Sequence, residues 1–201
     1  MCPKTKEQFA AIRQKSEEKI LQVALELFVT KGFKATSISS IALKANISKG
    51  LLYNYFDSKS DLLRRIVSDA IETGKEMFTE AITAYDSPAE ELEHFVLSVV
   101  ENIKTHTQYW HLLTSLAFQP DVLSEVQDLL DQSVKWNINR GTEIFSKMGS
   151  KDPMQDSLLF GASLDGIMLH YLHLRDSYPI DAIAQRLIKS YCTTPNLINS
   201  N

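Results

Sequence analysis

Several side chains with affinity for DNA follow one another closely in the segment SKGLLYNYFDSK of this sequence. Lys49 can donate to the acceptors of guanine or to a phosphate, and the Tyr53 hydroxyl can donate to a phosphate oxygen. Gly50 has no side chain, so the backbone there can approach a base pair closely. Leu51 can contact the methyl group of thymine, and Lys59 lies where a further phosphate contact is expected. These residue types at these spacings predict a surface that reads double-stranded DNA.

The prediction rests on the whole set, because any one of these residues alone is more often an ordinary exposed side chain. The full set of candidate DNA-binding residues is Ser37, Ser48, Lys49, Gly50, Leu51, Tyr53, Asn54, Tyr55 and Lys59. The alternative is a helix-turn-helix that contacts another protein and does not bind DNA. The positive charge at Lys49 and Lys59 argues against that alternative, since a protein-contact face has no need of phosphate ligands.

Two short helices joined by a tight turn would position these residues. The first helix begins with Ser37 as its N-cap, and its apolar residues recur at intervals of three and four, which places them on one buried stripe. These apolar residues are Ile38, Ile41, Ala42 and Ala45. Asn46 ends the helix, because asparagine tolerates the left-handed backbone of a helix C-terminus best after glycine. Ile47, in the turn, is expected to point into the core.

The second helix, from Ser48 to about residue 56, separates an inward face from an outward one. Ser48 caps this helix, and the free N–H groups of its first turn can donate hydrogen bonds to a phosphate. Leu52 and Phe56 are four residues apart and face inward. The opposite side carries Lys49, Gly50, Tyr53 and Asn54.

The segment from residue 16 to about residue 71 resembles the DNA-binding domain of the TetR family of bacterial transcriptional regulators. The matching residues are Ile20, Ala24, Leu27, Phe28, Gly32, Phe33, Ala35, Thr36, Ile41, Ala42, Ser48, Lys49, Gly50, Tyr53, Phe56, Lys59, Leu62 and Leu63. The family usually has glycine where this sequence has Asn46, a change that the turn tolerates, and tyrosine or histidine where it has Tyr55. The resemblance implies a DNA-binding helix-turn-helix at 37–56, and it implies little about a ligand because the remainder of such proteins diverges widely.

Charge is distributed unevenly along the chain. The net charge is -4, yet residues 1–60 hold ten Lys and Arg against five Asp and Glu, which leaves -9 for the other 141 residues. The basic end contains the predicted DNA-binding segment, and neutralisation of phosphates supplies most sequence-independent affinity for DNA. No stretch approaches the roughly 18 apolar residues of a membrane-spanning helix, and the N-terminus lacks the apolar core of a secretory signal. We therefore expect a cytoplasmic protein without a membrane partner.

Helix signals recur along the whole chain and strand signals do not, which predicts an all-α fold of about nine helices. The predicted domains are an N-terminal extension at 1–15, a three-helix DNA-binding domain at 16–71, a helical effector-binding and dimerisation bundle at 72–193, and a flexible tail at 194–201. A long helix from about Lys59 to Ala84 links the two domains. Gly74 interrupts this helix, and we attribute that glycine to close packing rather than to a bend.

The last two predicted helices, at 153–175 and 179–192, are candidates for self-association. Residues 158–174 are apolar on nearly every side and include small residues that permit close helix approach, while the final helix carries one apolar stripe. Such a pair needs a partner surface, which either an internal core or a second copy can supply. Members of the TetR family typically dimerise through these two helices, so the resemblance implies a homodimer. Two recognition helices related by a two-fold axis can enter major grooves about 34 Å apart, which predicts a palindromic operator.

Bulky side chains in the bundle predict a pocket for a small-molecule effector. The candidates are Trp110, Trp136, Met168 and Tyr171, which fall on helices expected to surround the bundle interior. Most side chains of this kind are ordinary core residues. The resemblance implies a repressor in which the effector changes the separation or tilt of the two DNA-binding domains, so that ligand and DNA antagonise each other. We expect no cofactor.

A metal site or an enzyme-like bundle is the remaining alternative. His170 and His173 are three residues apart and share a helix face, but Asp165 lies five and eight residues away from them. No zinc-protease helix motif, phosphate-binding loop or nucleophile elbow occurs in the sequence. We therefore expect neither a metal site nor a catalytic site.

Overall fold

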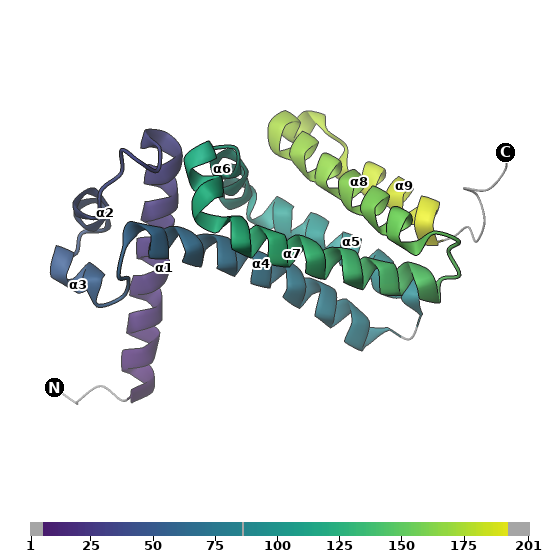
Figure 1. Ribbon diagram of the computed structural model, residues 1–201, viewed down its shortest axis with the longest axis horizontal. Coiled ribbons are helices and arrows are strands. Elements are labelled where there is room, and N and C mark those ends of the chain that lie inside the picture. The colour runs from purple at the N-terminus through teal and green to yellow at the C-terminus, as the bar shows by residue number, and fades with distance from the viewer. Residues whose placement is uncertain (1–5, 86, 193–201) are drawn as a thin grey trace. The chain divides into compact units, whose positions relative to one another are not determined.

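The computed structural model describes residues 6–85 and 87–192, which form helices and no strands (Figure 1). In chain order the elements are α1 (Lys6–Lys31), α2 (Ile38–Ala45), α3 (Lys49–Tyr53), α4 (Lys59–Ala84), α5 (Pro88–Thr105), α6 (Thr107–Ala117), α7 (Pro120–Lys147), α8 (Pro153–Leu174), the 3-10 helix η1 (Arg175–Ser177) and α9 (Ile180–Cys192). The predicted all-α fold is confirmed. The predicted flexible tail at 194–201 lies outside the described residues. Of the described helices, none has the length and apolar character needed to cross a membrane.

The helices gather into two compact units. The first unit contains the described part of Met1–Asp69 together with Leu112–Leu129, and the second contains the described parts of Ala70–His111 and Leu130–Asn201. Helices α4, α6 and α7 therefore each contribute residues to both units. The sequence predicts a DNA-binding domain at 16–71 alone, and the structure adds the end of α6 and the start of α7 to that unit.

Helix α1 is one continuous element that begins ten residues before Ser16, the first residue of the predicted DNA-binding domain. The Ser16 hydroxyl donates to the carbonyl of Ile12 (2.9 Å), so the serine bonds to the preceding turn and does not cap a new helix. The buried face of α1 includes Ile20, Val23, Ala24, Leu25, Leu27 and Phe28.

A buried threonine ties the start of α2 to the end of α1. Gly32 ends α1 with a φ of 85°, a left-handed conformation that glycine adopts at little cost. The Thr36 side chain is buried, and its hydroxyl lies within hydrogen-bond distance of the carbonyls of Leu27 (3.1 Å) and Gly32 (2.9 Å). These contacts fix the helix-turn-helix against α1.

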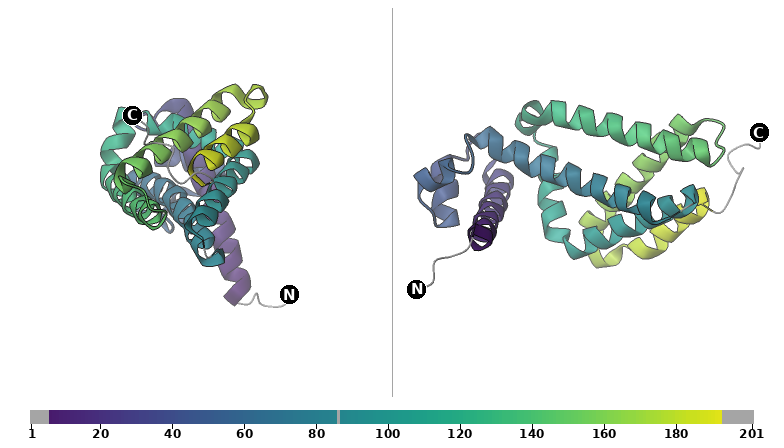
Figure 2. Two further views of the ribbon diagram at one scale, coloured as in Figure 1. Left: turned by 90° about the vertical axis from the view of Figure 1, so that its right-hand side faces the viewer. Right: turned by 90° about the horizontal axis from the view of Figure 1, so that it is seen from below.

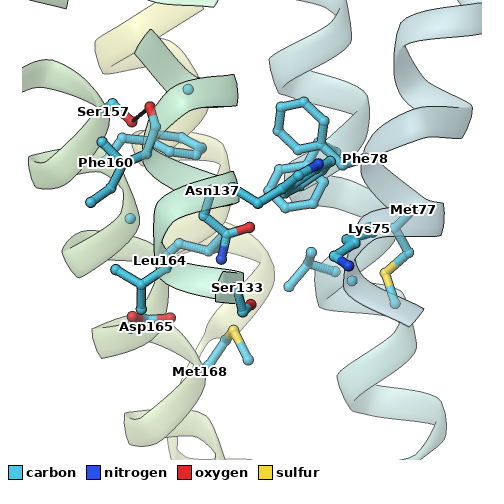
Figure 3. Close-up of a pocket in the computed structure, with 18 of the residues that line it drawn as sticks. Lys75, Met77, Phe78, Ser133, Asn137, Ser157, Phe160, Leu164, Asp165 and Met168 are labelled. Atoms are coloured by element: carbon cyan, nitrogen blue, oxygen red, sulfur yellow. Dashed lines mark hydrogen bonds between the residues drawn. The ribbon is translucent and has the colours of Figure 1, made fainter. Parts of the chain in front are cut away.

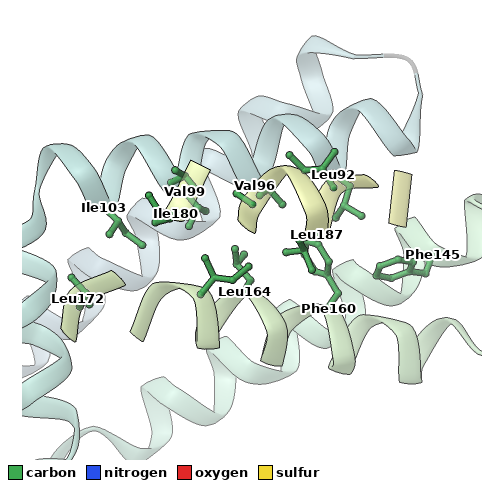
Figure 4. Close-up of a cluster of buried hydrophobic side chains, with 14 residues drawn as sticks. Leu92, Val96, Val99, Ile103, Phe145, Phe160, Leu164, Leu172, Ile180 and Leu187 are labelled. Atoms are coloured by element: carbon green, nitrogen blue, oxygen red, sulfur yellow. The ribbon is translucent and has the colours of Figure 1, made fainter. Parts of the chain in front are cut away.

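The second unit has a hydrophobic core between α5, α8 and α9 (Figure 4). Helix α9 packs against both α5 and α8, and Figures 1 and 2 show α8 and α9 running side by side. The core residues are Leu92, Val96, Val99, Val100, Ile103, Phe145, Phe160, Leu164, Ile167, Leu172, Ile180, Ala184, Leu187 and Ile188. The inward stripe predicted for the last helix is thus buried within one chain.

The prediction of close helix packing at Gly74 is wrong. Close packing of two helices occurs at a different glycine. A Cβ atom built at Gly74 would meet no atom within 4 Å, and α4 continues through this position. A Cβ atom at Gly141 of α7 would instead lie 2.1 Å from the Oγ atom of Ser157 on α8. Only glycine at residue 141 therefore permits the observed approach of α7 and α8.

Candidate functional site

The turn between α2 and α3 is built by local hydrogen bonds. The Ser40 N–H donates to the Ser37 hydroxyl (3.1 Å), and the Ser37 N–H donates to the Ser40 hydroxyl (3.2 Å), which closes a capping box around the start of α2. Asn46 has the left-handed backbone that the sequence predicts, with φ 58° and ψ 47°. Ile47 is only half-buried, because the turn holds it at the edge of the core and not within it.

Helix α3 presents a polar face outward and an apolar face inward. The Leu51 N–H donates to the Ser48 hydroxyl (3.0 Å), so Ser48 caps the helix. Leu52 is fully buried, whereas Tyr53 is 46% exposed and Leu51 39% exposed. Also exposed are Ser37, Lys49, Gly50 and Asn54. The helix ends at Tyr53, sooner than predicted, and the following turn carries Phe56 into the core.

The charge of Lys49 remains available to a ligand. Its ammonium lies 5.8 Å from the centre of the Tyr53 ring, which keeps the two side chains together on the outward face. No carboxylate among the described residues forms an ion pair with Lys49, whereas nearby Lys44 pairs with Glu26 (2.9 Å). Lys49 and Tyr53 can therefore donate together to one stretch of a phosphate backbone.

Lys59 has an internal role that the sequence does not predict. Its ammonium donates to the carbonyls of Phe33 (2.6 Å) and Lys34 (3.2 Å), and it lies 4.5 Å from the centre of the Phe33 ring. An ammonium has three N–H donors, so at most one remains for the predicted phosphate contact. Lys59 therefore joins the start of α4 to the loop that follows α1.

Arg13 braces the end of α3, and sequence reasoning missed it. Its guanidinium donates to the carbonyl of Asn54 (3.4 Å) and lies 5.1 Å from the centre of the half-buried Tyr55 ring. This contact spans about forty positions of sequence and starts in a segment expected to be a loose extension. No local pattern signals it.

Helix α7 and the short connection before it contribute further contacts inside the first unit. Arg64 donates to both carboxylate oxygens of Asp128 (2.7 Å each), and this guanidinium lowers the pKa of Asp128 to about 2. Gln119 donates to the carbonyl of Phe28 (3.3 Å). The region 112–129 is therefore bonded to the helices that support α3, and the sequence does not predict these contacts.

Comparison with known proteins supports the resemblance read from the sequence. Residues 20–66, which include α2 and α3, match the model for bacterial regulatory proteins of the tetR family. The resemblance to the TetR family is thereby confirmed over the residues that form the helix-turn-helix.

Two curated regulators are similar to this chain in sequence. It is 28% identical to the HTH-type transcriptional regulator YuxN of Bacillus subtilis over 79% of this chain and 54% of YuxN. It is 30% identical to the HTH-type transcriptional repressor KstR2 of Mycolicibacterium smegmatis over 52% of this chain and 49% of KstR2. The matches thus span about half the length of these relatives.

The structural likeness extends along most of the chain. NalD, the secondary repressor of the MexAB-OprM multidrug efflux pump in Pseudomonas aeruginosa, superposes with a TM-score of 0.70. The alignment covers 90% of this chain and 95% of NalD at 22% identity. This similarity establishes that the chain shares its fold with NalD.

A cavity of about 520 Å³ lies in the second unit (Figure 3). It is lined from α4, α5, α6, α7 and α8, and Figure 3 shows Ser133 and Asn137 between Lys75 on one side and Asp165 on the other. Trp110, Trp136 and Met168 line the cavity, as the sequence suggests. Tyr171 does not line the cavity, and it packs against the hydrophobic core of the second unit.

Aromatic contacts fix the rings of the cavity wall. The indole N–H of Trp110 donates to the side-chain oxygen of Asn102 (2.7 Å). Phe78 makes edge-to-face contacts with Trp136 (5.7 Å between centres) and with Phe95 (4.7 Å). The Trp110 N–H and the ring edges thus make contacts within the wall. These contacts hold the rings in place for a ligand of defined shape.

The histidines and aspartate considered for a metal site have separate environments. Asp165 lines the cavity, and His170 packs against the ring of Tyr178 (5.8 Å between centres). Within residues 6–85 and 87–192 no three His, Cys, Asp or Glu side chains come together as metal ligands would. The structure thus offers no support for the metal-site alternative.

Proposed function

We propose that this protein is a repressor that binds a palindromic operator as a homodimer and releases it when a small molecule enters the cavity. The single observation that carries the DNA-binding part is the outward face of α3. Lys49, Gly50 and Tyr53 lie exposed together on a helix whose opposite residue, Leu52, is fully buried. This arrangement presents donors to DNA while the domain core holds the helix in place.

Each exposed residue then has a distinct role on the duplex. With α3 in the major groove, Lys49 and Tyr53 donate to phosphate or base acceptors, and Gly50 allows close backbone approach. The candidates Ser37 and Ser48 stand at the N-termini of α2 and α3, where free N–H groups favour a phosphate. Asn54, Tyr55 and Lys59 complete the proposed surface.

The outer surface of α8 supports dimerisation. The exposed large apolar residues on this helix that do not line the cavity are Met154, Leu159, Leu169 and Leu174. A Cβ atom at Gly166 would meet nothing within 4 Å inside the chain, so room remains for a second helix to approach. A second copy would cover this surface and would present two α3 helices to successive major grooves about 34 Å apart.

The shared helices support a response to ligand. Helices α4 and α7 line the cavity in the second unit, and each also contributes residues to the first unit. Inside the first unit these helices are joined by the Arg64–Asp128 ion pair (2.7 Å). A ligand that alters α4 and α7 would favour one arrangement of the DNA-binding unit, which makes ligand and DNA antagonists. KstR2 and NalD are repressors, which supports repression as the output.

The test is DNA binding by two variants that keep the fold. We expect Lys49→Ala and Tyr53→Phe each to weaken binding about tenfold, the loss of one charge-assisted or neutral phosphate contact. The measurement is fluorescence anisotropy with duplexes tiled across the region upstream of the protein's own gene. Lys135→Ala, an exposed lysine of α7, is the matched control. Wild-type affinity in both α3 variants would reject the proposed DNA-binding face.

The same assay at increasing salt separates DNA from a protein partner. Displacement of counterions from phosphates makes the logarithm of the binding constant fall linearly with the logarithm of salt concentration. We expect this slope to be steep for the wild type and shallower by about one unit for Lys49→Ala. A flat titration would indicate that α3 contacts a protein.

A further inference from the structure

We propose that the cavity binds a lipophilic organic cation and that the Asp165 carboxylate is its counter-charge. The inference rests on the proposed function, because it names the chemical class of the effector for the same cavity. Neither the family nor the relatives named above assign a ligand to this chain. The inference follows from the charges and rings of the wall.

Asp165 lies in the middle of the α8 face that forms one wall. Gly161 is four residues before it and Met168 three residues after it, and residues at these spacings share a helix face. All three line the cavity. The adjoining face of α8 carries Phe160, Leu164 and Ile167, which belong to the buried core, and Phe160 and Leu164 border the cavity as well. The backbone of α8 therefore places Asp165 on the cavity side of the helix.

Asp165 is the charged group of the wall that lacks a partner of opposite charge. Lys75, on the wall from α4, pairs with Glu72 (3.3 Å). Arg140 does not line the cavity; it lies 5.8 Å from the centre of the Phe78 ring and pairs with Glu143. No residue in the described part of the chain forms an ion pair or hydrogen bond with Asp165. The residue is exposed, and partial desolvation of its carboxyl beside the cavity raises the pKa of that group. A cationic ligand would supply the missing charge, and an anionic one would add a second negative charge.

The aromatic residues of the cavity suit a cation with an apolar body. Trp110 and Trp136 both line the cavity, and the faces of tryptophan rings attract cations more strongly than those of other side chains. The only hydrogen-bond donor of the Trp110 indole is already bonded to Asn102, so its remaining contribution to a ligand is the ring surface. Apolar contact and a diffuse positive charge therefore match this wall better than a strongly hydrated ion does.

The size of the cavity agrees with an organic ligand. A volume of about 520 Å³ lies within the roughly 300 to 1,000 Å³ of typical small-molecule sites. Side-chain amides and a hydroxyl from Asn102, Asn137 and Ser133 add a few polar groups to a mostly apolar lining. A ligand with several aromatic or alkyl groups around one cationic centre satisfies both features.

Intrinsic fluorescence provides a direct readout. The chain contains two tryptophans, Trp110 and Trp136, and both line the cavity. The full-length protein would be titrated with tetraphenylphosphonium, with tetraphenylborate, which has the same shape and the opposite charge, and with neutral triphenylphosphine oxide. We expect the phosphonium to bind at least about tenfold more tightly than the borate, because Asp165 attracts one and repels the other.

Two variants assign the preference to one side chain. Asp165→Asn keeps the size of the side chain and removes its charge, so the affinity for the phosphonium should fall about tenfold while that for the neutral probe stays unchanged. Lys75→Gln is the matched control on the facing wall, and it should keep the preference for the phosphonium. Circular dichroism verifies that each variant is folded.

Three outcomes would overturn the inference: tighter binding of the borate, unchanged phosphonium affinity in Asp165→Asn, or no fluorescence response to any probe. DNA binding by the same preparations separates this failure from failure of the proposed function. A protein that binds its upstream duplex and prefers the borate remains a regulator with an anionic effector. A protein that binds the phosphonium and no duplex contradicts the regulator proposal alone.

Discussion

Lys49 and Lys59 carry the same charge but contact different groups. The ammonium of Lys49 is exposed beside the Tyr53 ring, whereas that of Lys59 donates to the carbonyls of Phe33 and Lys34. Their sequence context suggests a phosphate contact for both, because the type of residue and its place near a helix start are alike. Only the three-dimensional contacts separate a DNA-facing lysine from one that also supports the domain.

Replacing each lysine by glutamine should separate these roles. We expect Lys59→Gln to lower the free energy of unfolding by about 1–3 kcal/mol, because hydrogen bonds from a charged donor to two carbonyls are lost. Lys49→Gln should leave stability unchanged and should weaken DNA binding. Urea denaturation followed by circular dichroism measures the first effect. Equal stability of the two variants would mean that the Lys59 contacts contribute nothing.

Asp165 should make stability depend on pH in the direction opposite to that of a carboxylate in an ion pair. Because its pKa is raised in the folded protein, the folded state binds this proton more tightly than the unfolded state does. Stability contributed by the protonated form is therefore present below the ordinary value of 3.8 and is lost as the pH rises through the raised pKa.

Asp165→Asn should consequently be more stable than the wild type at neutral pH, and the difference should vanish near pH 3. The measurement is the midpoint of urea denaturation across this pH range, with the exposed Asp176→Asn on η1 as control. A destabilised Asp165→Asn at neutral pH would show that the carboxylate has a stabilising partner. Removing a charge is expected to stabilise the folded protein where that charge serves to bind a ligand.

The helix ends show what short sequence patterns can predict. Ser37, Asn46 and Ser48 act within three or four residues of themselves, and the structure places a cap or a left-handed turn at each. Ser16 and Ser87 carry the same signal, but neither side chain caps a helix: Ser16 bonds inside α1, and Ser87 makes no capping hydrogen bond. A serine caps a helix only where the residues before it are not themselves helical. Packing against distant parts of the chain decides whether they are.

The sequence does not predict the contacts between elements that lie far apart along the chain. Arg13 reaches Asn54, Lys59 reaches Phe33, and Arg64 reaches Asp128. Each contact depends on how helices pack in space, and no periodicity in the sequence encodes it. For the same reason, three of four cavity residues could be proposed from their bulk and helix, and Tyr171 could not be distinguished from them.

The two glycines of α4 and α7 should respond in opposite directions to alanine. Gly141→Ala places a Cβ atom 2.1 Å from the Ser157 hydroxyl, and overpacking of about 1–3 kcal/mol should exceed the roughly 1 kcal/mol gain in helix propensity. Gly74→Ala meets no atom within 4 Å and should stabilise α4 by up to about 1 kcal/mol.

Thermal denaturation of both variants tests this pair. Adding Ser157→Ala to Gly141→Ala removes the atom in closest contact and should recover part of the lost stability. If Gly141→Ala alone is as stable as the wild type, α7 and α8 can separate at little cost. If Gly74→Ala is destabilised, the backbone at that residue departs from an ordinary helix.

Opposite charges in the two parts of the molecule suit its proposed tasks. Residues 1–60 have a net charge of +5 and include α3, and the remaining residues have -9 and include the cavity. A positive N-terminal part attracts phosphates, and an excess of carboxylates elsewhere favours an organic cation over an anion. Composition indicates this division without any structure, because it depends only on where charged residues occur in the chain.

If two copies associate through the outer face of α8, changes on that face should alter the affinity for the operator. Leu159 is 53% exposed, and Gly166 lies seven residues further along the same helix face. A glutamate at residue 159 would place a charge in the proposed interface, where its burial is unfavourable. We expect Leu159→Glu to be monomeric in analytical ultracentrifugation.

The monomer should bind a palindromic operator at least about a hundredfold more weakly, because the second half-site no longer adds to the affinity of the first. It should bind a single half-site as the wild-type chain does, since α3 is unchanged. Leu97→Glu, an exposed leucine of α5, is the matched control and should remain dimeric. A dimeric Leu159→Glu would place the interface elsewhere. A monomeric one with full operator affinity would show that one copy of α3 is sufficient, which excludes two-fold recognition.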